Sequence, residues 1–135
     1  MEEIGTASGT ENERVRGAPK RLLFVCTANQ HRSRTAEALF RRTSRYEARS
    51  AGTDVSPREP EEQPVTEELL SWADVVFVME PYHRDVLHER FPGRAPKIVV
   101  LDIEDRYLRG DPDLVRTLKK RVSPHLEVLE GGDEL

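Results

Sequence analysis

The sequence predicts an α/β domain in which a doubly wound, four-stranded parallel sheet lies between two layers of helices, as a three-layer sandwich. Short apolar runs alternate with helical patterns along the chain, and this alternation is typical of parallel sheets. The strongest runs contain no polar residue, as strands buried on both faces require. The chain has 135 residues, which is the size of one domain with one core.

Four segments are expected to form the strands. Leu22–Val25, Val75–Met79 and Ile98–Leu101 are strongly apolar, and Tyr46–Ser50 is a weaker candidate. A helix between successive strands allows them to run parallel, and such crossovers are right-handed.

The first helix is expected over Ser33–Arg42. Ala36, Leu39 and Phe40 recur at the helical spacing i, i+3, i+4 and form an apolar stripe. Ser33 is expected to be the N-cap, because a serine hydroxyl accepts a hydrogen bond from an otherwise unpaired N–H of the first turn.

Three more helices complete the pattern. One is expected over Val65–Trp72, and another runs from Pro81 in its first turn to Phe91, where Pro92–Gly93 stops it. Asp111 is expected to cap the last helix, ahead of a first-turn proline. That helix places four apolar residues on one face: Leu114, Leu118, Val122 and Leu126.

The two ends of the chain differ from this folded part. Residues 1–19 have no hydrophobic period and several small polar residues, so they are expected to be a disordered tail. A single domain is expected over residues 20–130. Residues 131–135, which begin with two glycines, are expected to be a frayed end.

Composition argues against several classes of protein. The longest apolar runs have five residues, against the roughly 20 that a membrane-spanning helix needs. The net charge of -4 gives no bulk attraction to nucleic acid or to an anionic membrane. The N-terminus has no signal-peptide pattern, and a single cysteine forms no internal disulfide, so a cytoplasmic location is expected.

The segment Cys26–Ser33 lies between the first expected strand and the first expected helix, which is where α/β sheets bind ligands. Backbone N–H groups of such a loop can form a concave anion site, which the helix dipole strengthens. Arg32 follows Cys26 by six residues, so a sulfur and a guanidinium can face one tetrahedral oxyanion. These positive surroundings favour the thiolate, which is the nucleophilic form of cysteine.

An isolated cysteine after an apolar run is more often a small packed side chain than a nucleophile. The C-x5-R-S spacing and its place between strand and helix favour the nucleophile here. We therefore expect a phosphate-binding loop, Cys26–Ser33. After Cys26, the loop consists of Thr27, Ala28, Asn29, Gln30, His31, Arg32 and Ser33.

At this point the chain resembles the low-molecular-weight protein tyrosine phosphatases, in particular a short bacterial branch of that family. The matching positions are Leu23–Cys26, Asn29, Arg32–Ser33, Ala36–Ala38, Phe40, Ser50–Thr53, Val76–Met79, Ile103–Asp105 and Tyr107. They span essentially the whole folded part. The resemblance implies a phosphomonoester hydrolase, a protein tyrosine phosphatase, acting on a phosphorylated protein or a small phosphomonoester. It also implies that the loop binds free phosphate.

The resemblance assigns roles to residues of the loop and of the second strand. Cys26 is implied as the nucleophile that forms a phosphocysteine intermediate, and Arg32 as the phosphate clamp. Asn29 and Ser50 are implied to hold the shape of the loop. Ser33 is implied to hydrogen-bond the Cys26 sulfur and to ease its departure from phosphorus.

The reaction also needs a proton donor for the leaving oxygen. The resemblance implies Asp105 in this role, although Arg106 stands where the family has a proline. Asp102 is the reserve candidate. Asp111 and Asp113 are better explained as the cap and the first-turn charge of the last helix.

The residues say less about the substrate. Tyr107 is expected to form one wall of the pocket, but the stretch between the second strand and the second helix supplies no aromatic partner. The four histidines have no zinc-like spacing with Cys26, so no metal or other cofactor is expected. His83 and His88, five residues apart on one helix, are expected in solvent.

Two other functions stay open at this point. An arsenate reductase is the first, because arsenate mimics phosphate; intramolecular reductases use a disulfide cascade, so with only Cys26 this chain would need an external thiol. A non-catalytic phosphate-binding module is the second, since Arg34 and Arg106 both replace prolines of the family. The sequence does not indicate an oligomeric state.

Overall fold

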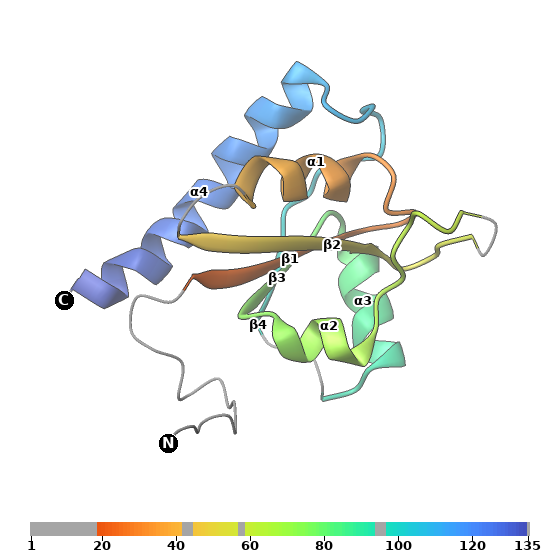
Figure 1. Cartoon of the computed structure of the whole chain (residues 1–135), viewed down its shortest axis with the longest axis horizontal. Helices are drawn as coiled ribbons and strands as arrows, with labels where there is room; N and C mark the ends of the chain where they lie inside the picture. The colour runs from red at the N-terminus through yellow and green to blue at the C-terminus, as the bar shows by residue number, and fades with distance from the viewer. Residues whose placement is uncertain (1–18, 42–44, 57–58, 94–96, 135) are drawn as a thin grey trace.

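The computed structural model describes residues 19–41, 45–56, 59–93 and 97–134, with side chains as far as Leu126, and has the expected α/β architecture (Figure 1). The expected N-terminal tail therefore lies outside the described residues, except for Pro19. Strands and helices alternate strictly. In chain order they are β1 (Lys20–Cys26), α1 (Arg32–Phe40), β2 (Tyr46–Gly52), α2 (Glu67–Trp72), β3 (Val75–Val78), α3 (Pro81–Arg90), β4 (Lys97–Val100) and α4 (Pro112–Glu134).

The strands form one parallel sheet with the order β2-β1-β3-β4. β1 pairs with β2 over its whole length, from Lys20 opposite Tyr46 to Cys26 opposite Gly52. On its other side β1 pairs with β3. The direction in which the chain adds strands reverses between β1 and β3, so the carboxyl ends of these two strands form the topological switch point where α/β proteins bind ligands.

Helices cover both faces of the sheet, which confirms the doubly wound, three-layer prediction. α1 and α4 lie on one face, and α2 and α3 lie on the other (Figure 1). On the first face Phe24 stacks against Phe40 and Phe77, with ring centroids 5.6 and 5.2 Å apart. The four apolar residues predicted for the last helix are buried there. On the second face Leu23 and Val25 pack with residues of α2 and α3.

The N-terminus of α1 differs from the sequence prediction. The helix begins at Arg32 with His31 at its N-cap, and no side chain caps it. The Ser33 hydroxyl lies 3.0 Å from the Cys26 sulfur and accepts a hydrogen bond from Asn29. Because these contacts occupy the hydroxyl, the predicted Ser33 cap is wrong.

The other helix ends lie closer to the prediction. Thr66 caps α2 by accepting a hydrogen bond from the N–H of Leu69. The Asp111 carboxylate accepts a hydrogen bond from the N–H of Asp113, which confirms the predicted cap of α4. The α4 backbone passes through two glycines to Glu134 instead of fraying before them, because glycine costs a helix only about 1 kcal/mol relative to alanine.

Candidate active site

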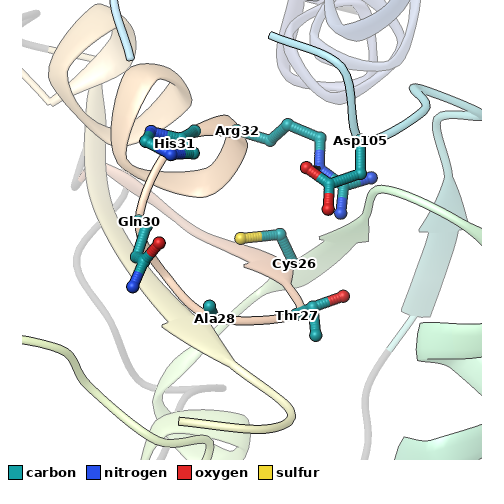
Figure 2. Close-up of a pocket in the computed structure, with 7 residues that line it drawn as sticks. All are labelled: Cys26, Thr27, Ala28, Gln30, His31, Arg32 and Asp105. Atoms are coloured by element: carbon teal, nitrogen blue, oxygen red, sulfur yellow. Dashed lines mark ion pairs between the residues drawn. The ribbon is translucent and has the colours of Figure 1, made fainter. Parts of the chain in front are cut away.

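The phosphate-binding loop encloses a pocket at the topological switch point. Its volume is about 100 Å³. Figure 2 shows the Cys26 sulfur among the surrounding side chains, with Arg32 and Asp105 on one side and Gln30 on the other. The lining consists of Cys26, Thr27, Ala28, Gln30, His31, Arg32 and Asp105. The fold thus brings together the cysteine, the arginine and the first-choice acid that the sequence singled out.

Asn29 lies within this loop and hydrogen-bonds to groups on both sides of its amide. Its φ of 58° is left-handed, a conformation that asparagine adopts more readily than most residues. The buried side chain accepts a hydrogen bond on Oδ1 from the N–H of Gln63, at 2.8 Å. Because an N–H only donates, the amide nitrogen must face the other way, toward Ser33 and Ser50. Nδ2 donates to these two hydroxyls at 2.9 and 3.0 Å.

The Asn29 bonds also leave the hydroxyl protons of the two serines for other acceptors. Ser33 Oγ accepts from Asn29 and lies 3.0 Å from Cys26 Sγ, so its own O–H can donate to a Cys26 thiolate, which can only accept. A donor in this position stabilises a thiolate. Ser50 likewise accepts from Asn29 and donates to Glu37 Oε1 at 2.5 Å. Hydrogen bonds thus join Asn29 to Ser33 and Ser50, and Ser33 lies within hydrogen-bonding distance of the Cys26 sulfur.

Arg32 carries its charge into the interior, where it is only 2% exposed. Nη1 donates to the carbonyl of Ile103 at 2.7 Å and lies 3.4 Å from Glu80 Oε1. Nε lies 3.9 Å from Asp105 Oδ1. A buried guanidinium needs such partners, because an unpaired buried charge is strongly destabilising. They hold the guanidinium plane at the pocket wall, where it can bind two oxygens of one anion.

Gly52, at the end of β2, allows the loop to pack closely against the sheet. A Cβ at this position would lie 2.6 Å from the Thr27 carbonyl oxygen and 2.9 Å from the Asn29 nitrogen. Both atoms belong to the loop backbone, so a larger residue would distort the anion site. The next N–H, of Thr53, donates to the Cys26 carbonyl at 2.9 Å. This role of Gly52 was not predicted from the sequence, although a glycine at the end of a strand is a known signal of close backbone approach.

His83 departs furthest from the sequence prediction. It was expected in solvent, but its side chain is fully buried. The Glu80 N–H donates to Nδ1 at 3.0 Å, and Nε2 lies 2.9 Å from Thr27 Oγ1. Burial, and secondly the positive charge of Arg32, lower the pKa of His83 to about 4, while the negative charge of Asp105 acts in the opposite direction. The prediction is wrong because the first turn of α3 packs against the loop.

The two candidate acids and the expected pocket wall lie in different surroundings. Asp105 lines the pocket, and its side chain is 67% exposed. Asp102 is exposed, has a left-handed φ of 58° and lies outside the lining. Tyr107 also lies outside the lining, because it packs into the core beside α4. The guanidinium of Arg106 lies over the Tyr107 ring, 4.4 Å from its centroid.

Within the described part of the chain, no three His, Cys, Asp or Glu side chains come together as metal ligands do. None of the helices described there combines the length and the apolar character needed to cross a membrane.

A model of the family described as low molecular weight phosphotyrosine protein phosphatase matches residues 21–71. The protein-arginine-phosphatase of Bacillus subtilis (strain 168) is 31% identical over 103 residues, covering 59% of this chain and 69% of that protein. A cysteine-to-serine mutant of the YwlE arginine phosphatase, with a phosphorylated active-site serine, is 25% identical with a TM-score of 0.63, covering 79% of this chain and 95% of that one. The low-molecular-weight protein tyrosine phosphatase of T. tengcongensis is 27% identical with a TM-score of 0.62, covering 83% and 99%.

These similarities and the geometry of the loop define the chain as a cysteine phosphatase. It belongs to the low-molecular-weight protein tyrosine phosphatase family, which confirms the resemblance in its sequence.

The buried His83 ring predicts that stability depends on pH. Its pKa is about 4 in the folded protein and 6.5 without the fold. Between these values the unfolded chain binds more protons than the folded one, so the free energy of unfolding falls as the pH decreases from about 6.5 to about 4. This contribution amounts to up to about 3 kcal/mol, and no such loss occurs above pH 6.5.

Chemical denaturation of the wild type and of His83→Gln, at about pH 7 and about pH 4.5, measures this contribution. Glutamine does not titrate in this range, so the wild type is expected to lose more stability than the variant between the two pH values. Equal losses would mean that His83 does not have the lowered pKa.

Proposed function

We propose that this cysteine phosphatase hydrolyses phosphorylated side chains of proteins through a phosphocysteine intermediate on Cys26. Three groups converge on one pocket and support the proposal. The Cys26 sulfur lies 3.0 Å from the Ser33 hydroxyl oxygen, Arg32 places a buried guanidinium at the wall of the pocket, and Asp105 contributes a carboxyl group. Together they supply a nucleophile, an anion clamp and an acid.

In the first half-reaction the Cys26 thiolate attacks phosphorus in line with the leaving atom. The S–P bond forms while the bond from phosphorus to the substrate side chain breaks. Arg32 and the loop N–H groups at the N-terminus of α1 stabilise the equatorial phosphoryl oxygens. Asp105 donates its proton to the leaving atom and becomes a carboxylate.

In the second half-reaction water attacks the phosphorus of the phosphocysteine. The Asp105 carboxylate accepts a proton from this water, and the S–P bond breaks. The Ser33 hydroxyl donates a hydrogen bond to the departing thiolate and so stabilises the negative charge that develops on the sulfur. Inorganic phosphate leaves, and Cys26 and Asp105 return to their starting protonation states.

The pocket lining favours phosphoarginine over phosphotyrosine as the substrate residue. Gln30 and Asp105 offer side-chain acceptors, and none of the described lining residues is Phe, Tyr or Trp. A planar guanidinium is bound by such acceptors, whereas a phenyl ring depends on apolar and aromatic walls. The relatives include an arginine phosphatase and a tyrosine phosphatase, so family membership alone does not distinguish between the two substrates. The choice of phosphoarginine therefore rests on the residues that line the pocket.

A matched pair of peptides, one with phosphoarginine and one with phosphotyrosine, tests function and substrate together. In the presence of EDTA we expect phosphate release from both, with kcat/KM about tenfold higher for phosphoarginine, the equivalent of one good hydrogen bond. Cys26→Ser should release none from either peptide. Arg32→Lys should lower kcat/KM by about 10²-fold, because lysine cannot form two parallel bonds to the anion.

His88→Asn, at an exposed position of α3, is the control and should keep wild-type activity. An active Cys26→Ser variant would exclude the phosphocysteine. A wild type that binds phosphate but hydrolyses neither peptide would favour the non-catalytic module, and thiol-dependent arsenite formation from arsenate would favour the reductase. Higher kcat/KM for phosphotyrosine would exclude only the choice of phosphoarginine.

Asp105→Asn and Asp102→Asn identify the acid. With phenyl phosphate, whose leaving group needs protonation, Asp105→Asn is expected to lower kcat by about 10²- to 10⁴-fold. With para-nitrophenyl phosphate, a better leaving group, the loss should be far smaller. Asp102→Asn is the matched control, since asparagine also accepts the left-handed φ at that position. A larger, leaving-group-dependent loss in Asp102→Asn would assign the acid to Asp102 instead.

A further inference from the structure

The first turn of α3 contacts both ends of the phosphate-binding loop. His83 Nε2 lies 2.9 Å from the hydroxyl oxygen of Thr27, the residue directly after Cys26. Glu80 Oε1 lies 3.4 Å from Arg32 Nη1, near the other end of the loop. A capping box joins His83 to Glu80, the N-cap of α3: the Glu80 side chain accepts from the His83 N–H, and His83 Nδ1 accepts from the Glu80 N–H.

These contacts define which nitrogen of His83 carries the proton. The Glu80 N–H can only donate, so Nδ1 must be bare in order to accept its bond. A neutral ring then has its proton on Nε2, which donates to Thr27 Oγ1. Because the Thr27 oxygen accepts this bond, its own hydroxyl proton points away from His83 and is available to a bound substrate.

We infer that His83 is a positioning residue for phosphoryl transfer: its Nε2–H holds the Thr27 hydroxyl beside Cys26 while its Nδ1 holds the turn whose Glu80 carboxylate contacts Arg32. The inference rests on the proposed function and adds to it a group that touches neither substrate nor phosphorus. His83 is absent from the pocket lining, whereas Thr27 is part of it, so the ring acts through Thr27.

The surroundings of the ring keep it in the form that this role requires. Three charged groups face it: Arg32 at the start of α1, Asp105 after β4, and Glu80 in its own turn. The Tyr82 ring packs beside it, with centroids 5.1 Å apart. Burial and Arg32 outweigh Asp105 and lower the pKa of the ring to about 4, so His83 is neutral at physiological pH. A protonated Nδ1 would face the Glu80 N–H, so the bond between the ring and the first turn of α3 would be lost, while the Nε2–H bond to Thr27 would remain.

Two substitutions of His83 each remove one of the two hydrogen bonds of the ring and keep the other. His83→Asn places an oxygen where Nδ1 was, so it keeps the acceptor for the Glu80 N–H and loses the donor to Thr27. His83→Gln places an amide nitrogen where Nε2 was, so it keeps the donor to Thr27 and loses the acceptor. Thr27→Val removes the hydroxyl while keeping the shape of the side chain. His88→Asn is the control on the exposed side of the same helix.

The kinetics of these variants on para-nitrophenyl phosphate test the inference. We expect His83→Asn and Thr27→Val each to lower kcat/KM by about tenfold, the value of one hydrogen bond, at melting temperatures within a few degrees of the wild type. The double variant should lose no more than either single one, because both remove the same contact. His83→Gln should recover most of the rate, even where it is less stable than His83→Asn.

Wild-type rates in a folded His83→Asn variant, or losses that multiply in the double variant, would overturn the inference. The tautomer of His83 can also be determined without any substrate: two-bond proton–nitrogen NMR spectra should show a proton on Nε2 and none on Nδ1. The opposite tautomer would overturn the inference even if the variants do not fold. A wild type that hydrolyses no phosphomonoester would instead overturn the proposed function, so the two failures can be told apart.

Discussion

The amide of Asn29 is the contact on which the rest of the site depends. A loop that turns through a left-handed residue and buries a polar side chain is stable only when that side chain is fully hydrogen-bonded. Asn29 meets this condition with Gln63 on one side and Ser33 and Ser50 on the other. The same bonds leave the Ser33 O–H to donate to a Cys26 thiolate. Loop shape and nucleophile orientation therefore follow from one side chain.

The order of the strands in the sheet explains why residues from several elements can contact the phosphate-binding loop. Because β1 lies between β2 and β3, the loop that follows it meets the end of β2 on one side and the start of α3 on the other. Gly52 of β2 provides the space for the loop backbone, and His83 and Glu80 of α3 hold its side chains. The segment after β4 contributes the carbonyl of Ile103 to Arg32. Each supporting group comes from the carboxyl end of a different strand, as the doubly wound fold allows.

The sequence predicts what depends on periodicity or on local spacing, including the apolar runs of the sheet and the separation of Cys26 from Arg32. It does not predict His83, whose contact with Thr27 joins residues 56 apart and depends on how α3 packs after β3. The sequence also does not predict that the Tyr107 side chain packs into the core, because the irregular segment before α4 has no hydrophobic period. The one local signal is the acid-proline-x-histidine pattern at Glu80, which is typical of a capped first turn.

If the site works in this way, phosphate must pass through the sulfur of Cys26. The wild-type enzyme can be mixed with a phosphopeptide, denatured during the first turnover and digested, so that mass spectrometry locates any bound phosphate. We expect a burst of dephosphorylated peptide and at most one phosphate per chain, carried by Cys26. Phosphate on another nucleophilic side chain of the pocket lining, which also contains Thr27, His31 and Asp105, or a burst without any phosphorylated residue would refute the phosphocysteine mechanism.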